Sequence, residues 1–336
     1  MPSPARPLAK QDLLEKVITA IKACGWQYLL LKSDHPFRLR VFRDHETYTI
    51  RVYIWNITHG GGTARAPDEF RIQITGVSQF EPEPDGKTLI LGWWDAVGVF
   101  AGFDYRKHAG KLGASPSMQI REAFLQEAYT TRGLAPCNKG NQEIAIAFHP
   151  GFIIEYIRSL EELHDVGKAR EDFEILKVAA ADPAAVNDSV LEKVTGARRK
   201  AIRSVVQTLR DSSFRDRVLT AYSHRCAMCS LQLELVEAAH IIPVPEPSST
   251  DETCNGLTLC VLHHRAYDRA LVTVADDYHV LVSSVEKGRL IKIGFDGGLA
   301  SFVAGLRPII GLPPDVKDRP KVQYLKQGRE IRHWNN

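Results

Sequence analysis

Hydrophobic and polar positions alternate with two different periods in the first half of the chain. Residues 10–23 repeat apolar side chains at helical spacing, which predicts an amphipathic helix. Residues 38–43, 48–57 and 70–75 alternate polar and apolar side chains, as half-buried strands do. More uniformly apolar runs, typical of more deeply buried strands, occupy residues 88–93, 97–103 and 144–149. Residues 1–160 are therefore predicted to form one α+β domain with a mainly antiparallel sheet.

The second half of the chain begins with a polar segment. Residues 161–205 have helical spacing but are polar, and Pro183 interrupts the pattern, so this segment is interpreted as a helical linker. Residues 206–336 are assigned to a second domain, in which residues 277–284 and 289–295 are predicted strands. The predicted fold class is therefore α+β, with a β-rich N-terminal domain followed by a smaller C-terminal domain.

Composition places the protein among soluble globular proteins. The chain has 336 residues, of which 44% are hydrophobic and 25% are charged. No apolar run approaches the roughly 20 residues that cross a bilayer. The N-terminal residues lack the apolar core of a secretory signal, so the expected location is the cytoplasm.

Positive charge is concentrated in the middle of the chain. The net charge is only +3, but residues 193–225 contain nine lysines and arginines against two aspartates. Such a run suits the binding of phosphates, although a solvated helix face gives the same pattern. Because the run directly precedes a cysteine-rich segment, we assign DNA contacts to Arg198, Arg199, Lys200 and Arg203.

Three of the six cysteines crowd into residues 226–260. Cys226 and Cys229 form a C-x2-C pair, and Cys260 and His263 repeat the same spacing. Two such pairs supply the four ligands of a tetrahedral structural Zn²⁺ site. The alternative, a set of buried thiols, is less consistent with two matched pairs, and a disulfide framework is not expected in a long chain without a signal peptide.

A second set of polar residues lies within and just after this frame: His240, Asn255, His264 and Asp268. Phosphodiester hydrolysis needs an activated nucleophile, and a histidine titrates in the right range to be the general base. If a helix begins near residue 262, His264 and Asp268 stand one turn apart and could share a divalent cation such as Mg²⁺ or Mn²⁺. Asn255 is expected to hydrogen-bond within the inter-strand loop and keep His240 aimed.

The segments RCAMC, AAHIIP and CNGLTLCVLHHRAYD together resemble the HNH (ββα-metal) endonuclease family, most closely its zinc-stapled subgroup of predicted restriction endonucleases. The resemblance covers roughly residues 214–275. It implies two strands and a helix, with His240, Asn255 and His264 as the catalytic residues. One departure is Ala239, since many members carry an Asp or His metal ligand there. The resemblance thus leaves His264 and Asp268 to hold the catalytic cation, with Glu237 as a further candidate.

The N-terminal domain carries candidate readers of DNA but no confirming motif. By architecture, a β-rich domain followed by an HNH domain resembles modification-dependent restriction endonucleases, whose N-terminal domain senses a modified base. Trp55, Trp93 and Trp94 could stack on a flipped base, and the loop of residues 59–62 could enter a groove. Four arginines could follow a DNA backbone: Arg38, Arg40, Arg43 and Arg51. The alternative is that the tryptophans are core residues and the arginines a solvated strand face.

The leading hypothesis is a metal-dependent DNA endonuclease of host defence, of the restriction type, that acts on DNA with modified bases. A second hypothesis makes the N-terminal domain a sensor of a small molecule that switches cleavage on. A third makes the chain a nucleic-acid-binding protein whose zinc fold does not cut. Because one HNH site cuts one strand, double-strand cleavage would require a homodimer or two successive nicks. The basic C-terminal segment is expected to pack against the nuclease core and to lend phosphate contacts.

Overall fold

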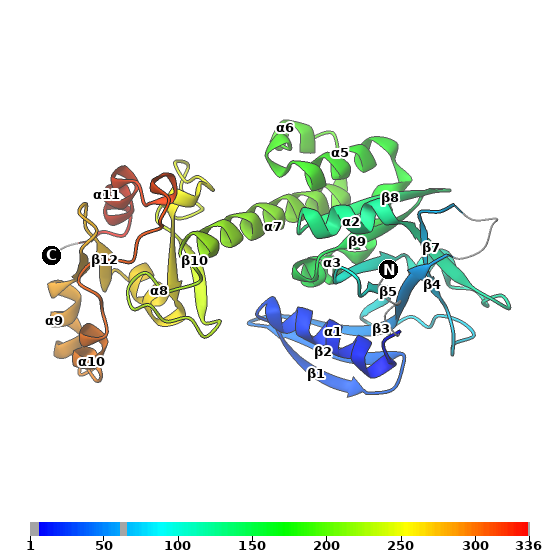
Figure 1. Ribbon diagram of the computed structural model, residues 1–336, viewed down its shortest axis with the longest axis horizontal. Coiled ribbons are helices and arrows are strands. Elements are labelled where there is room, and N and C mark those ends of the chain that lie inside the picture. Colours follow the sequence, from blue (N-terminus) through cyan, green and yellow to red (C-terminus); the bar gives the residue numbers. More distant parts are fainter. Residues whose placement is uncertain (1–6, 61–65, 335–336) are drawn as a thin grey trace. The chain divides into compact units, whose positions relative to one another are not determined.

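The computed structural model describes residues 7–60 and 66–334, and it divides the chain into two units, Met1–Leu209 and Arg210–Asn336 (Figure 1). Helix α7 (Gly196–Ala221) contributes residues to both units. The predicted mixture of helices and sheets, with a sheet-rich N-terminal region, is confirmed. Among the helices in the described ranges, none combines the length and the apolar character needed to span a membrane.

The first unit is built on a nine-stranded sheet in its described part. The central strands follow the order β1-β2-β3-β5-β6-β9-β8, while β4 pairs with β3 and β7. All pairs are antiparallel except β3 with β5. The strands are β1 (Gln27–Lys32), β2 (Phe37–Arg43), β3 (Glu46–His59), β4 (Glu69–Gln73), β5 (Lys87–Trp94), β6 (Val99–Phe103), β7 (Ser117–Arg121), β8 (Leu134–Gly140) and β9 (Glu143–Phe148). The mainly antiparallel sheet is thus as predicted.

Two hydrophobic cores lie on opposite faces of this sheet, which explains why its central strands are apolar throughout. In β3, Val52 and Ile54 belong to one core and Tyr53 and Trp55 to the other. Helix α1 (Lys10–Ala23) covers the first face, and α2 (Glu122–Thr130) belongs to the second. A strand that is covered on both faces loses the polar and apolar alternation of a half-buried strand.

Residues 161–205, predicted to be a helical linker, form part of the first unit. After α3 (Ile153–Arg158), the helices of this region are α4 (Leu160–Asp165), α5 (Arg170–Ala181), α6 (Asp188–Leu191) and the first part of α7. Leu163, Leu176 and Ile202 are fully buried in the first core. Each short helix buries only one narrow face and therefore needs few apolar residues. The polar composition that results made the segment resemble a linker.

The second unit is built around one hairpin and one helix. Strands β10 (Val236–His240) and β11 (Gly256–Cys260) pair antiparallel, and α8 (Val261–Asp268) follows directly. A smaller hairpin joins β12 (Val272–Val274) and β13 (Val280–Val282). The remaining helices are α9 (Ser284–Lys292), α10 (Leu299–Ala304) and α11 (Val322–Ile331). Residues 289–295, predicted to be a strand, instead lie at the end of α9 and just after it, because Ser283 caps this helix through Glu286 N–H.

Candidate active site and metal centre

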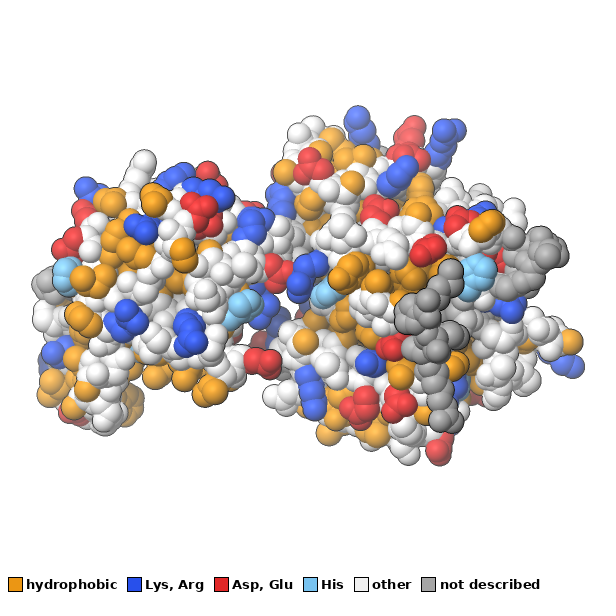
Figure 2. Space-filling view, in the orientation of Figure 1, with side chains coloured by type: hydrophobic (Ala, Val, Ile, Leu, Met, Phe, Trp, Pro, Cys, Tyr) orange, Lys and Arg blue, Asp and Glu red, His pale blue; other side chains and the backbone are white. Residues whose placement is uncertain are grey.

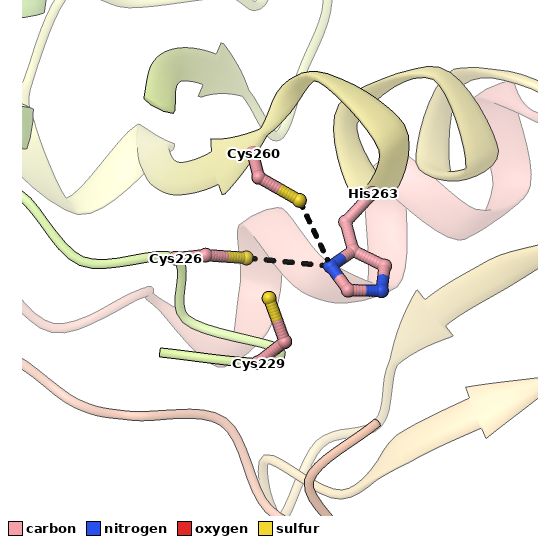
Figure 3. Close-up of side chains that lie close together, drawn as sticks. All are labelled: Cys226, Cys229, Cys260 and His263. Atoms are coloured by element: carbon pink, nitrogen blue, oxygen red, sulfur yellow. Dashed lines mark hydrogen bonds between the residues drawn. The ribbon is translucent and has the colours of Figure 1, made fainter. Parts of the chain in front are cut away.

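Three cysteines and one histidine from two distant segments meet in the second unit (Figure 3). Cys226 and Cys229 lie in a turn that follows α7, whereas Cys260 ends β11 and His263 lies in the first turn of α8. Backbone hydrogen bonds tie the turn to the hairpin, since the Ala227 N–H donates to the Thr258 carbonyl. Within the described residues, this is the one cluster of three or more such ligand groups.

The four ligand atoms are spaced as a tetrahedral zinc site requires. All lie within 4.8 Å of one another, and His263 Nδ1 is 3.4 Å from Cys226 Sγ and 3.2 Å from Cys260 Sγ. Zinc bonds of about 2.3 Å to sulfur and about 2.0 Å to nitrogen place tetrahedral ligands about 3.6 Å apart. Burial raises the pKa of the Cys226 and Cys260 thiols, and bound Zn²⁺ would hold them as thiolates. The cluster could therefore hold zinc.

His240 is the last residue of β10 and lies opposite Gly256 of β11. Its ring stacks on Phe214 of α7 with centroids 3.7 Å apart, and its Nε2 lies 3.3 Å from Asp251 Oδ1. A Cβ on Gly256 would come within 2.4 Å of Val218, so only glycine allows α7 to pack this closely beside the histidine. The ring of His240 is thus fixed between an aromatic face and a carboxylate.

The environment of His240 keeps its imidazole neutral at pH 7. Burial lowers the pKa of His240 below its ordinary value of 6.5, while the Asp251 carboxylate opposes this shift. A neutral imidazole has one N–H donor and one lone pair. If Nε2 donates its proton to Asp251, Nδ1 keeps the lone pair and can accept a proton from a water molecule.

Asn255 is completely buried and holds the loop between the two strands. Its side-chain Oδ1 accepts a hydrogen bond of 2.9 Å from the Ile242 N–H, and its Nδ2 donates one of 2.8 Å to the Thr250 carbonyl. These bonds fix both ends of residues 242–250, and Thr250 directly precedes Asp251. Asn255 therefore holds the loop that leads into Asp251.

His264 lies on α8 between two carboxylates. Its Nδ1 is 2.6 Å from Glu237 Oε2 of β10, and its Nε2 is 3.6 Å from Asp268 Oδ2, one helical turn away. When Nδ1 donates to Glu237, the Nε2 lone pair points toward Asp268, which is how a carboxylate orients a metal-binding histidine. Two ligands of one octahedral cation are about 3 Å apart, so a small adjustment would let His264 and Asp268 share a cation. Glu237 is better placed as the partner of His264 than as a ligand.

Several residues around this site were not found from the sequence: Phe214, Asp251 and Arg332. Asp251 lies in a polar loop among other acidic and hydroxyl residues, where no spacing distinguishes it. Phe214 and Arg332 reach the site only through tertiary packing of α7 and of the C-terminal segment. The concentration of basic residues in the C-terminal segment was the one available signal for Arg332.

The basic residues predicted to contact DNA are mostly engaged within the first unit. Arg198 pairs with the buried Asp172 at 2.6 Å, and Arg203 pairs with Asp188 at 2.9 Å. Arg199 donates to backbone carbonyls of the preceding turn, whereas Lys200 is exposed. On the face shown in Figure 2, acidic and basic side chains are interspersed on both units, with no large field of one sign.

The predicted aromatic readers are core residues in this structure. Trp93 and Trp94 are each 7% exposed and belong to the cores on opposite faces of the sheet. Trp55 donates from Nε1 to the Thr75 carbonyl. These positions match the alternative in which the tryptophans fill the core. Because both faces of β5 are covered, the neighbouring rings of Trp93 and Trp94 are both buried.

Three of the four arginines that were predicted to follow a DNA backbone contact other residues of the first unit. Arg38 and Arg51 both contact the buried carboxylate of Glu83, so they are used within the fold. Arg43 lies over the ring of Trp26. In the loop of residues 59–62, His59 faces Phe70 edge to face, while residues 61 and 62 lie outside the described part.

Two family models match separate parts of the chain. Residues 226–275 match the model described as HNH endonuclease, and residues 48–157 match the model described as methylase-associated X1. Among solved structures, a modification-dependent restriction endonuclease, TagI, is similar at 13% sequence identity over 84% of this chain and 80% of that chain. The TM-score of 0.30 is too low to establish a shared fold. No curated protein matches the chain.

Proposed function

We propose that this chain, whose C-terminal unit contains an HNH endonuclease domain, is a metal-dependent DNA endonuclease in which His240 is the general base. The observation that carries the proposal is that β10 carries both His240, which pairs with Asp251, and Glu237, which pairs with His264 of α8. Strand β10 and helix α8 thus supply both a base and a cation-binding pair.

His240 performs the proton transfer in this proposal. Its neutral Nδ1 accepts a proton from the attacking water, and the imidazolium that forms is stabilised by Asp251 through Nε2–H. The stack on Phe214 limits ring rotation, so the lone pair stays directed toward the substrate. Asn255 keeps Asp251 in reach by fixing the loop.

His264 and Asp268 would hold the catalytic cation, either Mg²⁺ or Mn²⁺. Such a cation, when bound, would neutralise charge on the phosphate and on the leaving oxygen. Glu237 fixes the ring of His264 so that Nε2 faces the cation. Cys226, Cys229, Cys260 and His263 have a separate, structural role, because their zinc ion would fasten the turn after α7 to the start of α8.

We further propose that the chain recognises modified DNA. Support comes from the match of residues 48–157 to the methylase-associated family, together with the arrangement of a sheet-rich unit before an HNH domain. Among the four residues of α7 that were predicted to contact DNA, Lys200 is the best remaining candidate, since it is exposed. A homodimer would let two such sites cut both strands.

The proposal is tested by incubating the protein with supercoiled plasmid that carries or lacks methylated cytosine, with Mg²⁺, Mn²⁺ or EDTA. Cleavage that requires a metal and is lost in His264→Ala supports the assignment, while preference for methylated plasmid supports modification dependence. His279→Ala is the matched control, because His279 is exposed on a hairpin and its ring pairs with the nearby Asp277. Metal-independent cleavage, or equal activity of the His264→Ala variant, would overturn the assignment of the cation site.

A further inference from the structure

The C-terminal helix α11 lies outside the HNH-matched residues 226–275, yet it packs on the loop that completes the active site. The backbone N–H of Lys321 donates to the Cys254 carbonyl at 3.3 Å. Lys321, which directly precedes the helix, and Tyr324 both donate from their side chains to the Glu252 carboxylate. Gln327 donates to Ser248 Oγ. The helix thus contacts the same loop that Asn255 fixes from its other side.

A glycine allows α11 to approach the end of β10. A Cβ on Gly328 would lie 2.7 Å from the Ile241 carbonyl oxygen, which is shorter than a side chain tolerates. Because residue 328 has no side chain, the following turn can place Arg332 over the backbone of Ile241, the residue after His240. The close approach is therefore what places the arginine.

The side chain of Arg332 links the two halves of the proposed active site. It is 9% exposed. Its guanidinium donates to the His240 carbonyl at 3.1 Å and to the Ile241 carbonyl at 2.6 Å. The same group lies 4.3 Å from the ring centroid of Tyr267 and 3.6 Å from Asp268 Oδ1.

The carboxylate of Asp268 consequently lies between Arg332 and His264. Its Oδ1 faces Arg332 and its Oδ2 faces His264 Nε2. An arginine suits this position because its planar group presents several donors in fixed directions, whereas a lysine offers a single ammonium centre. Arg332 therefore fixes the backbone that carries the base and the direction of the carboxylate that faces the cation position.

We propose that Arg332 is a positioning residue for the nuclease reaction, acting through His240 and Asp268 without contacting DNA. This inference rests on the proposed function. It predicts that loss of Arg332 lowers kcat and leaves KM for DNA unchanged, because the guanidinium is bound to groups of the fold and the DNA-facing groups are retained. Partners that orient metal-binding residues typically contribute about 10- to 100-fold to activity.

The experiment compares Arg332→Ala and Arg332→Lys with Arg329→Ala. Arg329 is on the same helix and is also bound to a carbonyl and a carboxylate, those of Val274 and Asp276, away from the site. We expect kcat to fall about 10- to 100-fold in Arg332→Ala, to recover in part in Arg332→Lys, and to remain at the wild-type value in Arg329→Ala. The zinc content should be the same in all three.

A second measurement does not depend on cleavage. The NMR signals of the His240 imidazole, assigned by their loss in His240→Ala, should shift in Arg332→Ala and stay in place in Arg329→Ala. Equal kcat in Arg332→Ala and Arg329→Ala, or unshifted His240 signals in Arg332→Ala, would overturn the positioning role. Absence of cleavage by the wild type together with shifted His240 signals would overturn the proposed function but not the positioning of His240.

Discussion

Replacement of Asn255 by alanine tests how firmly the loop between β10 and β11 must be held. The side chain satisfies the buried Ile242 N–H and the Thr250 carbonyl. Alanine would leave both backbone groups without these partners. Because Asp251 follows Thr250 in the chain, the loosened loop would also release the carboxylate from His240.

The size of the effect follows from the burial of the two backbone groups. A buried donor left unpaired costs about 1–3 kcal/mol, and the partly buried carbonyl adds roughly 1 kcal/mol. The expected loss in the free energy of unfolding of the second unit is thus about 3 kcal/mol, which lowers its Tm by about 10 °C for a domain of this size. Below that temperature, cleavage should still fall at least about tenfold, because the base is no longer oriented.

Calorimetry and plasmid cleavage at 25 °C measure the two effects separately. Asn255→Asp keeps the acceptor for Ile242 N–H but sets a carboxylate against the Thr250 carbonyl, so it should not restore activity. Asn187→Ala is the control, since Asn187 caps the exposed helix α6 and its loss costs only about 1 kcal/mol. The reasoning would be refuted by an Asn255→Ala protein with wild-type Tm and wild-type cleavage.

Three further predictions address the base, the zinc site and the basic helix. Asp251→Asn removes the carboxylate that raises the pKa of His240, so the acid limb of the pH–rate profile should move to lower pH while the plateau rate falls; an unmoved limb would separate that limb from His240. Cys229→Ser should release zinc to a chelator, measured by elemental analysis against a wild-type content of about one ion per chain, whereas Cys254→Ser, outside the cluster, should retain it. Arg198→Ala should lower the Tm of the first unit because Asp172 loses its partner. Lys200→Ala should leave that Tm unchanged. If Lys200 contacts one phosphate, the slope of log K for DNA binding against the logarithm of the salt concentration should become shallower by about 0.9 in this variant.

The parts of the site that sequence could predict are those encoded by short spacing. The two pairs Cys226/Cys229 and Cys260/His263 have the same local spacing. The junction of β11 and α8 places Cys260 beside His263, and backbone hydrogen bonds join the turn of the first pair to β11. The hairpin and helix likewise follow from consecutive segments of the chain. Local patterns of this kind also identified the α+β class and the mainly antiparallel sheet.

The parts that sequence could not predict depend on tertiary packing. Asp251 lies beside His240 at the end of the loop that Asn255 holds, and Arg332 directly follows α11, which is far from α8 in the sequence. Trp93 and Trp94 point to opposite faces of β5, and only the helices and strands on both faces show that both rings are buried. Likewise, the apolar faces of residues 161–205 are buried in the first core. This burial makes the segment part of the first unit, and it depends on tertiary packing.

The most direct test of the account is the single-turnover rate of DNA cleavage by His240→Ala under saturating Mn²⁺. The variant should retain its zinc and its melting temperature within a few degrees, since the ring is stacked at the edge of the core. Loss of a general base should lower the rate about 10²- to 10⁴-fold relative to wild type. A His240→Ala protein that cleaves at the wild-type rate would contradict the assignment of His240 as the base.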